Sequence, residues 1–192
     1  FKPDGRLFVF LSRNQWAEPR TQTWPGPWNQ GDFFAVNMSG LDAESSILAD
    51  PSLQWTGTAD WSLDQVPEGE YRIQVLWDQD LEESGINAPG NLYSTVASVM
   101  IDDARELEIT LDHQIGPRSV AEHRLVREID LVSDTLSAWW GRPVHVRAAV
   151  LLPGGYQEGS DRAYPIRYQV AGYGGRYTRV NQLTGDRNFM EW

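Results

Sequence analysis

The sequence predicts an all-β chain, with an immunoglobulin-like β-sandwich followed by further strands in a second, smaller part. Short apolar runs of strand length alternate with turns rich in Pro and Gly, and helical periodicity is almost absent. Of the 192 residues, 41% are hydrophobic and nine are Trp. This composition supplies enough apolar material for a core and argues against disorder.

The first strands are separated by a long loop. Residues 5–13, GRLFVFLSR, have the length and the residue types of a strand, and residues 32–40 form the next one. Between them, residues 14–32 contain three Pro and three Trp, which excludes a helix and predicts a structured loop. Residues 41–58 predict an irregular connection, with room for one short helical turn at 43–48.

The clearest strand lies in residues 61–80, where a Pro-Glu-Gly turn precedes alternating apolar and polar side chains at 71–77. This alternation predicts a half-buried strand. Residues 87–102 contain a Pro-Gly turn and then an extended stretch, and residues 106–112 alternate aliphatic with acidic or hydroxyl side chains. We expect these two segments to pair as antiparallel neighbours through the Asp102-Asp103 turn.

The second part begins with residues 124–153, where two alternating runs flank Gly141-Arg142 and predict a hairpin. A helix over 124–139 competes, because this stretch lacks Gly and Pro, but its apolar residues do not repeat at helical spacing. A third strand is predicted at 164–170. The expected division of the chain is a sandwich, a linker and a second part, at residues 1–115, 116–123 and 124–192.

Four stretches of the chain carry a resemblance to a known family. They are Gly5-Arg6-Leu7-Phe8-Val9-Phe10, Asn87-Ala88-Pro89-Gly90-Asn91-Leu92-Tyr93-Ser94, Val150-Leu151-Leu152-Pro153-x-Gly155-Tyr156, and Tyr164-Pro165-x-x-Tyr168 with Gly172-Tyr173-Gly174-Gly175. Together they resemble esterases of the α/β-hydrolase superfamily, in the esterase D-like and feruloyl-esterase-like group that carries a β-sandwich before the catalytic domain. The resemblance covers nearly the whole chain and implies that residues 124–192 form the first strands of an α/β-hydrolase sheet and an oxyanion-type loop.

By this resemblance, Gly172, Tyr173 and Gly174 belong to the loop that supplies a backbone N–H group to the oxyanion hole. In the family the nucleophilic Ser, the acid and the His come later in the chain, and this sequence contains no Gly-x-Ser-x-Gly. The resemblance therefore implies a non-catalytic N-terminal accessory region of an ester hydrolase. Such a region packs on the catalytic domain and shapes substrate access or oligomer contacts, and neither catalytic side chains nor a cofactor are expected in it.

The alternative is a carbohydrate-binding module. Trp16, Trp24 and Trp28 lie in the Pro-rich loop, and flat aromatic rings at the edge of a β-sandwich can stack on sugar rings. The simpler interpretation is structural: these rings, together with Trp55 and Trp61, fill the core and cover the loop. Both interpretations remain open from the sequence.

Asp78, Asp80 and Glu82 place carboxylates at alternate positions after the strand at 71–77, a weak pattern for Ca²⁺. The pattern lacks the Gly that an EF-hand loop requires, and a solvated acidic turn is the simpler interpretation. The three His residues have neither metal-ligand spacing nor a neighbouring nucleophile, so we expect structural roles for them.

The net charge of −11, with no block among the sixteen basic residues, excludes a nucleic-acid surface and disfavours an anionic membrane surface. No apolar run approaches the roughly 20 residues that cross a bilayer. There is no Cys, hence no disulfide.

Because the chain begins with Phe1, we expect a secreted or periplasmic protein whose signal has been removed. The expected partners are a catalytic α/β-hydrolase domain, a second copy of the chain, and a carbohydrate or small ester.

Overall fold

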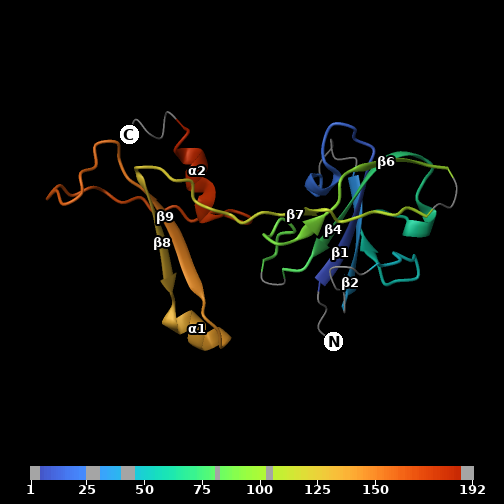
Figure 1. Ribbon diagram of the computed structural model, residues 1–192, viewed down its shortest axis with the longest axis horizontal. Coiled ribbons are helices and arrows are strands. Elements are labelled where there is room, and N and C mark those ends of the chain that lie inside the picture. The colour runs from blue at the N-terminus through green and yellow to red at the C-terminus, as the bar shows by residue number, and fades with distance from the viewer. Residues whose placement is uncertain (1–4, 25–30, 40–45, 81–82, 103–105, 187–192) are drawn as a thin grey trace. The chain divides into compact units, whose positions relative to one another are not determined.

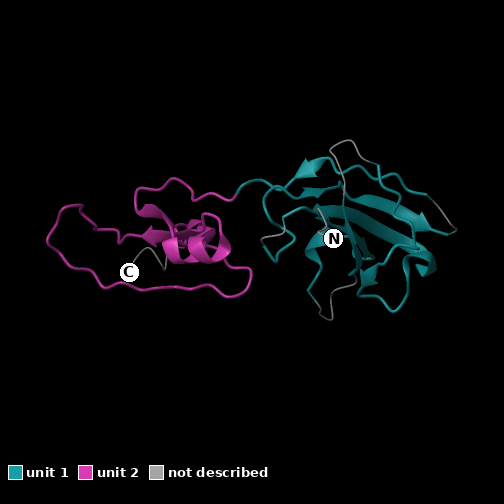
Figure 2. Cartoon of the chain, turned by 90° about the horizontal axis from the view of Figure 1, so that it is seen from below, with its two compact units in different colours: residues 1–117 teal, residues 118–192 magenta. Residues whose placement is uncertain are grey.

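The computed structural model describes residues 5–24, 31–39, 46–80, 83–102 and 106–186. The chain divides into two compact units, residues 1–117 and 118–192 (Figure 2). The strands are β1 (Gly5–Ser12), β2 (Gly31–Met38), β3 (Thr56–Gly57), β4 (Gly69–Asp78), β5 (Leu92–Tyr93), β6 (Ala97–Ile101), β7 (His113–Gln114), β8 (Val126–Val132) and β9 (His145–Leu151). The helical elements are α1 (Asp134–Trp140), α2 (Val180–Leu183) and the 3-10 turns η1 (Pro19–Thr21), η2 (Leu63–Gln65) and η3 (Tyr177–Arg179).

The first unit is built on an antiparallel sheet with strand order β3-β2-β1-β4-β5-β7, and β6 also pairs with β4 (Figure 1). β1 lies between β2 and β4, so that Leu7 stands opposite Val36 on one side and Trp77 on the other. The edge of β4 that faces away from β1 pairs with β6 along the first half of β4 and with β5 near its end. The predicted all-β, sandwich-like fold is confirmed.

Segments outside the central strands cover one face of this sheet. Leu11, Phe34 and Ile73 belong to a buried cluster on that face, and Trp55 and Trp61, from the segments that flank β3, pack against it. Burial of aromatic and aliphatic surface is the main favourable term that holds these segments to the sheet.

The opposite face of the sheet is also buried. The rings of Phe8, Phe10 and Phe33 lie 5.8–6.1 Å apart there, and η1 contacts β4 and β1. Gln74 and Leu76 of β4 face this side and are fully buried. The prediction that this strand is half-buried was therefore wrong, because the residues that alternate with its apolar face are covered by a second layer.

The structure differs from the sequence prediction at residues 106–112, which form no strand. The pairing with residues 87–102 is instead made by the residues that follow this segment, because β7 (His113–Gln114) pairs with β5. Its aliphatic side chains Ile109 and Leu111 still pack against the sheet.

Of the helical turn predicted at 43–48, residues 43–45 lie outside the described residues, and residues 46–48 are not helical.

The second unit contains the antiparallel pair β8–β9, with Val126 opposite Leu151 and Val132 opposite His145. The predicted hairpin is correct in its pairing but not in its turn, because α1 lies between the strands. Ser133 caps this helix by accepting a hydrogen bond from the Leu136 N–H, and Gly141 ends it with φ of 66°.

Residues 164–170 do not form the predicted third strand. Ile166, Tyr168 and Val170 are exposed. Alternating apolar residues provide the face of a strand, but a strand also needs a neighbour that completes its backbone hydrogen bonds.

In the described part of the chain, no helix is long and apolar enough to cross a bilayer.

Burial in the second face of the sheet should dominate the stability of the first unit. We expect Leu76→Ala, at a side chain that is 0% exposed, to lower the free energy of unfolding by about 2–5 kcal/mol. The control, Leu48→Ala at a side chain that is 68% exposed, should change it by less than about 0.5 kcal/mol. Urea denaturation measures both, and equal effects would contradict the assignment of this face to the core.

Candidate functional site

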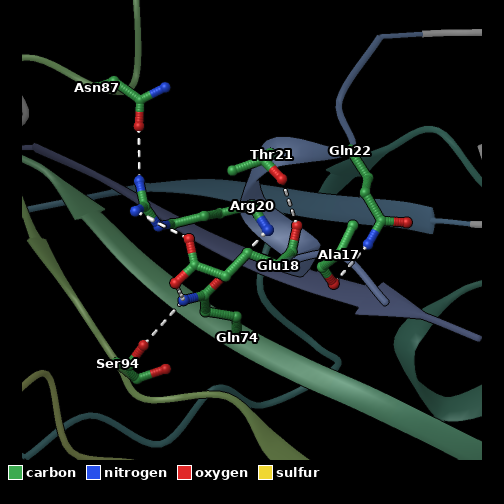
Figure 3. Close-up of polar contacts among 8 residues, drawn as sticks. All are labelled: Ala17, Glu18, Arg20, Thr21, Gln22, Gln74, Asn87 and Ser94. Carbon is green, nitrogen blue, oxygen red and sulfur yellow. Dashed lines mark hydrogen bonds and ion pairs between the residues drawn. The ribbon is translucent and has the colours of Figure 1, made fainter. Parts of the chain in front are cut away.

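Buried polar side chains hold the loop that carries Trp16 and Trp24 on the sheet (Figure 3). Gln74 of β4 is fully buried, and its Oε1 accepts a hydrogen bond of 3.1 Å from the Arg20 backbone N–H. The Gln74 Nε2 donates to the Ser94 carbonyl oxygen at 3.0 Å. Because a buried amide without partners is costly, this side chain ties the loop on one side and the segment after β5 on the other.

The side chain of Arg20 makes a second attachment. Its guanidinium carbon lies 4.2 Å from the centroid of the Tyr93 ring, in cation–π geometry. The same group donates to Asn87 Oδ1 at 2.7 Å and forms an ion pair of 3.0 Å with Glu18 (Figure 3). These contacts join η1 to β5 and to the loop before it, and they come from segments far apart in the sequence.

Side chains of β1 and β4 form hydrogen bonds with the first half of this loop. Arg72 of β4 donates to the carbonyl oxygens of Gln15 and Ala17 at 2.9 and 2.8 Å. Ser12 Oγ donates to Gln22 Oε1 at 2.8 Å, and Gln22 Nε2 donates back to the Ala17 carbonyl at 2.9 Å. The loop therefore has side-chain partners for several backbone carbonyls and a defined path.

On this anchored loop, Trp16 is 96% exposed and Trp24 is 79% exposed. Trp28 lies outside the described residues. Trp55 and Trp61 pack against the core, so the interpretation that the Trp residues fill the core applies to these two and not to Trp16 and Trp24. An exposed ring on an anchored loop can pack on a flat ligand at a reduced entropic cost of ordering.

The acidic turn after β4 is organised around a buried amide. Asn91 is fully buried, and its Nδ2 donates to Asp78 Oδ1 at 2.7 Å. Its Oδ1 accepts from the backbone N–H groups of Gln79 and Asp80 at 3.0 and 3.1 Å. Glu82 lies outside the described residues. Within the ranges that the structure describes, no three His, Cys, Asp or Glu side chains gather as metal ligands would.

The Gly-rich segment that resembles an oxyanion loop forms a turn, in which the Gly175 N–H donates to the Gly172 carbonyl at 2.9 Å. Gly174 has φ of 74°, and a Cβ atom on Gly175 would lie 2.2 Å from the Cβ of Ala171. The side chain of Tyr173 is exposed. The backbone of the turn itself therefore requires glycine at positions 174 and 175.

The β8–β9 pair carries an exposed apolar face. We use the name hairpin apolar face for the side chains of Ile129, Leu131, Val146, Ala148 and Val150. The register sets Ile129 opposite Ala148 and Leu131 opposite Val146, so these residues point to the same side of the pair. Leu131 is 61% exposed, and the other side chains of this face are exposed as well.

The other face of the pair carries the polar side chains of Glu128, Asp130, His145 and Arg147, with apolar residues at both of its ends. Asp130 Oδ1 lies 2.6 Å from His145 Nδ1, and its Oδ2 accepts from Arg147 Nε at 3.0 Å. The hydrogen bond from His145 and then that from Arg147 lower the pKa of Asp130. Tyr177 donates to Glu128 Oε1 at 2.8 Å, and this bond raises the pKa of the Tyr177 hydroxyl.

The other two His residues, His113 and His123, contact a neighbouring aromatic ring and a backbone N–H group, respectively. The His113 ring lies 5.1 Å from the Tyr93 ring, and His123 Nδ1 accepts from the Leu125 N–H at 3.3 Å.

Comparisons of the chain with family models, curated proteins and solved structures find no match.

Burial raises the pKa of the Asp78 carboxyl; the Asn91 hydrogen bond opposes this effect and the charge of Asp80 adds to it. The folded chain thus holds this proton more tightly than the unfolded chain. The resulting stabilisation is complete below the unfolded-state pKa and is lost as the pH rises through the raised native pKa. The stability of Asp78→Asn relative to the wild type should therefore increase from about pH 3 to about pH 7.

Urea denaturation at several pH values measures this difference. The control Glu70→Gln, at an exposed carboxylate of the same strand, separates the effect of Asp78 from a general loss of negative charge. A difference between Asp78→Asn and the wild type that does not change with pH would contradict the assigned burial.

Proposed function

We propose that this chain is the non-catalytic N-terminal accessory region of a carboxylic ester hydrolase, and that its second unit packs on the catalytic α/β-hydrolase domain. The observation that carries the proposal is the hairpin apolar face, which is exposed on a pair of only two strands. Contiguous exposed apolar surface typically marks a site that is covered by another part of a protein or by a partner. The hydrolase class comes from the sequence resemblance.

The energetics favour such a packing. An isolated two-stranded pair is marginal in water, and additional strands or a packed layer normally stabilise it. Covering the half-exposed Ile129, Leu131, Val146 and Val150 would contribute about 1 kcal/mol for each side chain as an upper estimate. The outer edges of β8 and β9 also offer backbone hydrogen-bonding groups to a further strand.

The proposal extends to three further features. The backbone of Gly172, Tyr173 and Gly174 contributes to the oxyanion hole of the assembled enzyme, while the nucleophile and its base come from the catalytic domain. The accessory region shapes substrate access or contacts a second copy. The protein acts outside the cytoplasm, as a secreted or periplasmic enzyme.

The test is expression of this chain alone and together with the polypeptide that follows it in its gene. We expect the continuation to contain Gly-x-Ser-x-Gly, and the longer polypeptide to hydrolyse short acyl esters such as p-nitrophenyl acetate, whereas the chain alone should not do so at enzyme-like rates. Leu131→Asp should sharply reduce the yield of active longer enzyme, because it places a charge in the proposed interface.

The matched control is Leu48→Asp, at a side chain of the first unit that is 68% exposed, against 61% for Leu131, and lies outside the proposed interface. A continuation without a nucleophile elbow, enzyme-like turnover by the chain alone, or equal effects of the two substitutions would each contradict the proposal.

A second candidate function, carbohydrate binding, is favoured by the exposure of Trp16 and Trp24 on the anchored loop. Sugar rings present C–H groups that pack on indole faces, and a loop with a defined path positions those faces before the ligand arrives. This candidate uses the first unit alone and is compatible with an accessory role.

Titration with soluble plant polysaccharides tests this second candidate. Binding should change the Trp fluorescence of the wild type, and Trp16→Ala with Trp24→Ala should weaken binding at least about tenfold, since stacking of one ring contributes on the order of 1 kcal/mol. Trp139→Ala, at an exposed ring of the second unit, is the control. No change in the wild type, or an equal effect of the control, would remove carbohydrate binding from this loop.

A further inference from the structure

A pocket of about 350 Å³ lies in the first unit beside β2 and β3, outside both surfaces discussed above. Its volume is within the range of small-ligand sites. Its lining combines aromatic, aliphatic and polar side chains, among them Phe34, Leu53, Gln54, Trp55, Asp60 and Trp61. The pocket thus has apolar walls and a few polar groups.

The aromatic walls are held in place by other contacts. The Trp55 Nε1–H donates to the Asp50 carbonyl oxygen at 2.9 Å, and the partly buried indole also packs against the core, so its orientation is fixed. The Trp61 ring packs 5.3 Å from the ring of Phe34, which is buried. A Cβ atom on Gly57 would lie 2.7 Å from the Phe34 ring, so glycine in β3 permits this close packing.

The charge of the pocket is negative. Asp60 is the one charged residue among the described residues that line it, and no Lys or Arg belongs to that lining. Ser62, also in the lining, donates a hydrogen bond to the neighbouring Asp64 carboxylate. The chain as a whole carries a net charge of −11, so the pocket disfavours anions and attracts cations.

We infer that this pocket binds an organic cation with a trimethylammonium group. Such a group spreads one positive charge over methyl groups, so it packs on Trp55 and Trp61 by apolar contact and by attraction to the negative faces of the rings. Asp60 supplies the opposite charge at the same site. The inference is independent of the proposed accessory role, because it concerns only the first unit.

A small metal cation does not fit this lining. Mg²⁺ and Ca²⁺ require several oxygen ligands, and the pocket offers one carboxylate among its described residues. A neutral sugar would use the rings and the amide of Gln54, but it would gain nothing from the charge of Asp60. The contribution of charge therefore decides between the two ligand classes.

The experiment titrates the whole chain with choline chloride at constant ionic strength and follows the indole N–H signals by NMR. Trp55→Phe and Trp61→Phe assign the two signals while they retain an aromatic ring. The uncharged isostere of choline, 3,3-dimethylbutan-1-ol, is the matched probe, and Nα-acetyl-trimethyllysine amide distinguishes a modified peptide from free choline as the source of the group.

We expect saturable shifts of the Trp55 and Trp61 signals with choline, and binding of the uncharged isostere that is about tenfold weaker. Trp61→Ala should abolish the shift of the remaining Trp55 signal, and Asp60→Asn should weaken binding about three- to tenfold, with circular dichroism as the check on folding. Trp139→Ala should leave the affinity unchanged.

Three results would overturn the inference. They are equal binding of choline and its isostere, the absence of saturable shifts in the folded wild type, and unchanged affinity in Asp60→Asn together with binding of methyl glucoside. The last result would assign the pocket to a neutral sugar. Since Asp60 is exposed, its substitution should not affect folding, and the test does not depend on Trp61→Ala alone.

Discussion

The first unit depends on one constraint: β4 has a neighbour on each edge and a covered face on each side. Ile73 and Trp77 are buried on one face, and Leu76 and Gln74 on the other. Because Gln74 is polar and fully buried, its amide needs hydrogen-bond partners. These partners are the Arg20 backbone N–H in η1 and the Ser94 carbonyl oxygen after β5. The position of the Trp-bearing loop is thus a consequence of burying a glutamine inside the sheet.

The second unit does not meet the same requirement. Its polar face is satisfied by hydrogen bonds within the unit, around Asp130 and Glu128, whereas its apolar face is exposed. An exposed apolar face on a pair of only two strands is the feature that a further covering layer would explain. This asymmetry is the basis for proposing that another protein layer covers the second unit, whereas the proposed hydrolase class of that layer comes from the sequence resemblance alone.

Much of the fold could be predicted from local pattern, because β1 and β2 are short apolar runs next to turn residues and β4 alternates in residue type. Pairing partners could not be predicted locally. Residues 106–112 alternate like a strand, but β7 (His113–Gln114), which follows them, is the segment that pairs with β5. The helix α1 was missed although Ser133 and Gly141 mark its ends, because alternation in the flanking strands dominated the pattern.

The candidate sites, like the strand pairing, could be predicted from the sequence only in part. Trp16 and Trp24 were identified from residue type, yet their exposure depends on Gln74, Arg20 and Arg72, which look like ordinary polar strand and loop residues in the sequence. The pocket beside β3 combines Phe34 with residues about 20 to 30 positions later, so tertiary packing alone brings it together.

The most direct test of the account is hydrogen exchange of backbone amides in the chain by itself, because the central claim is that the second unit lacks a covering layer for its strands. We predict strong protection in β1 and β4 and protection lower by orders of magnitude in β8 and β9. Equal protection in the two sets of strands would show that the second unit is stable on its own, and would contradict the assignment of its apolar face to a partner.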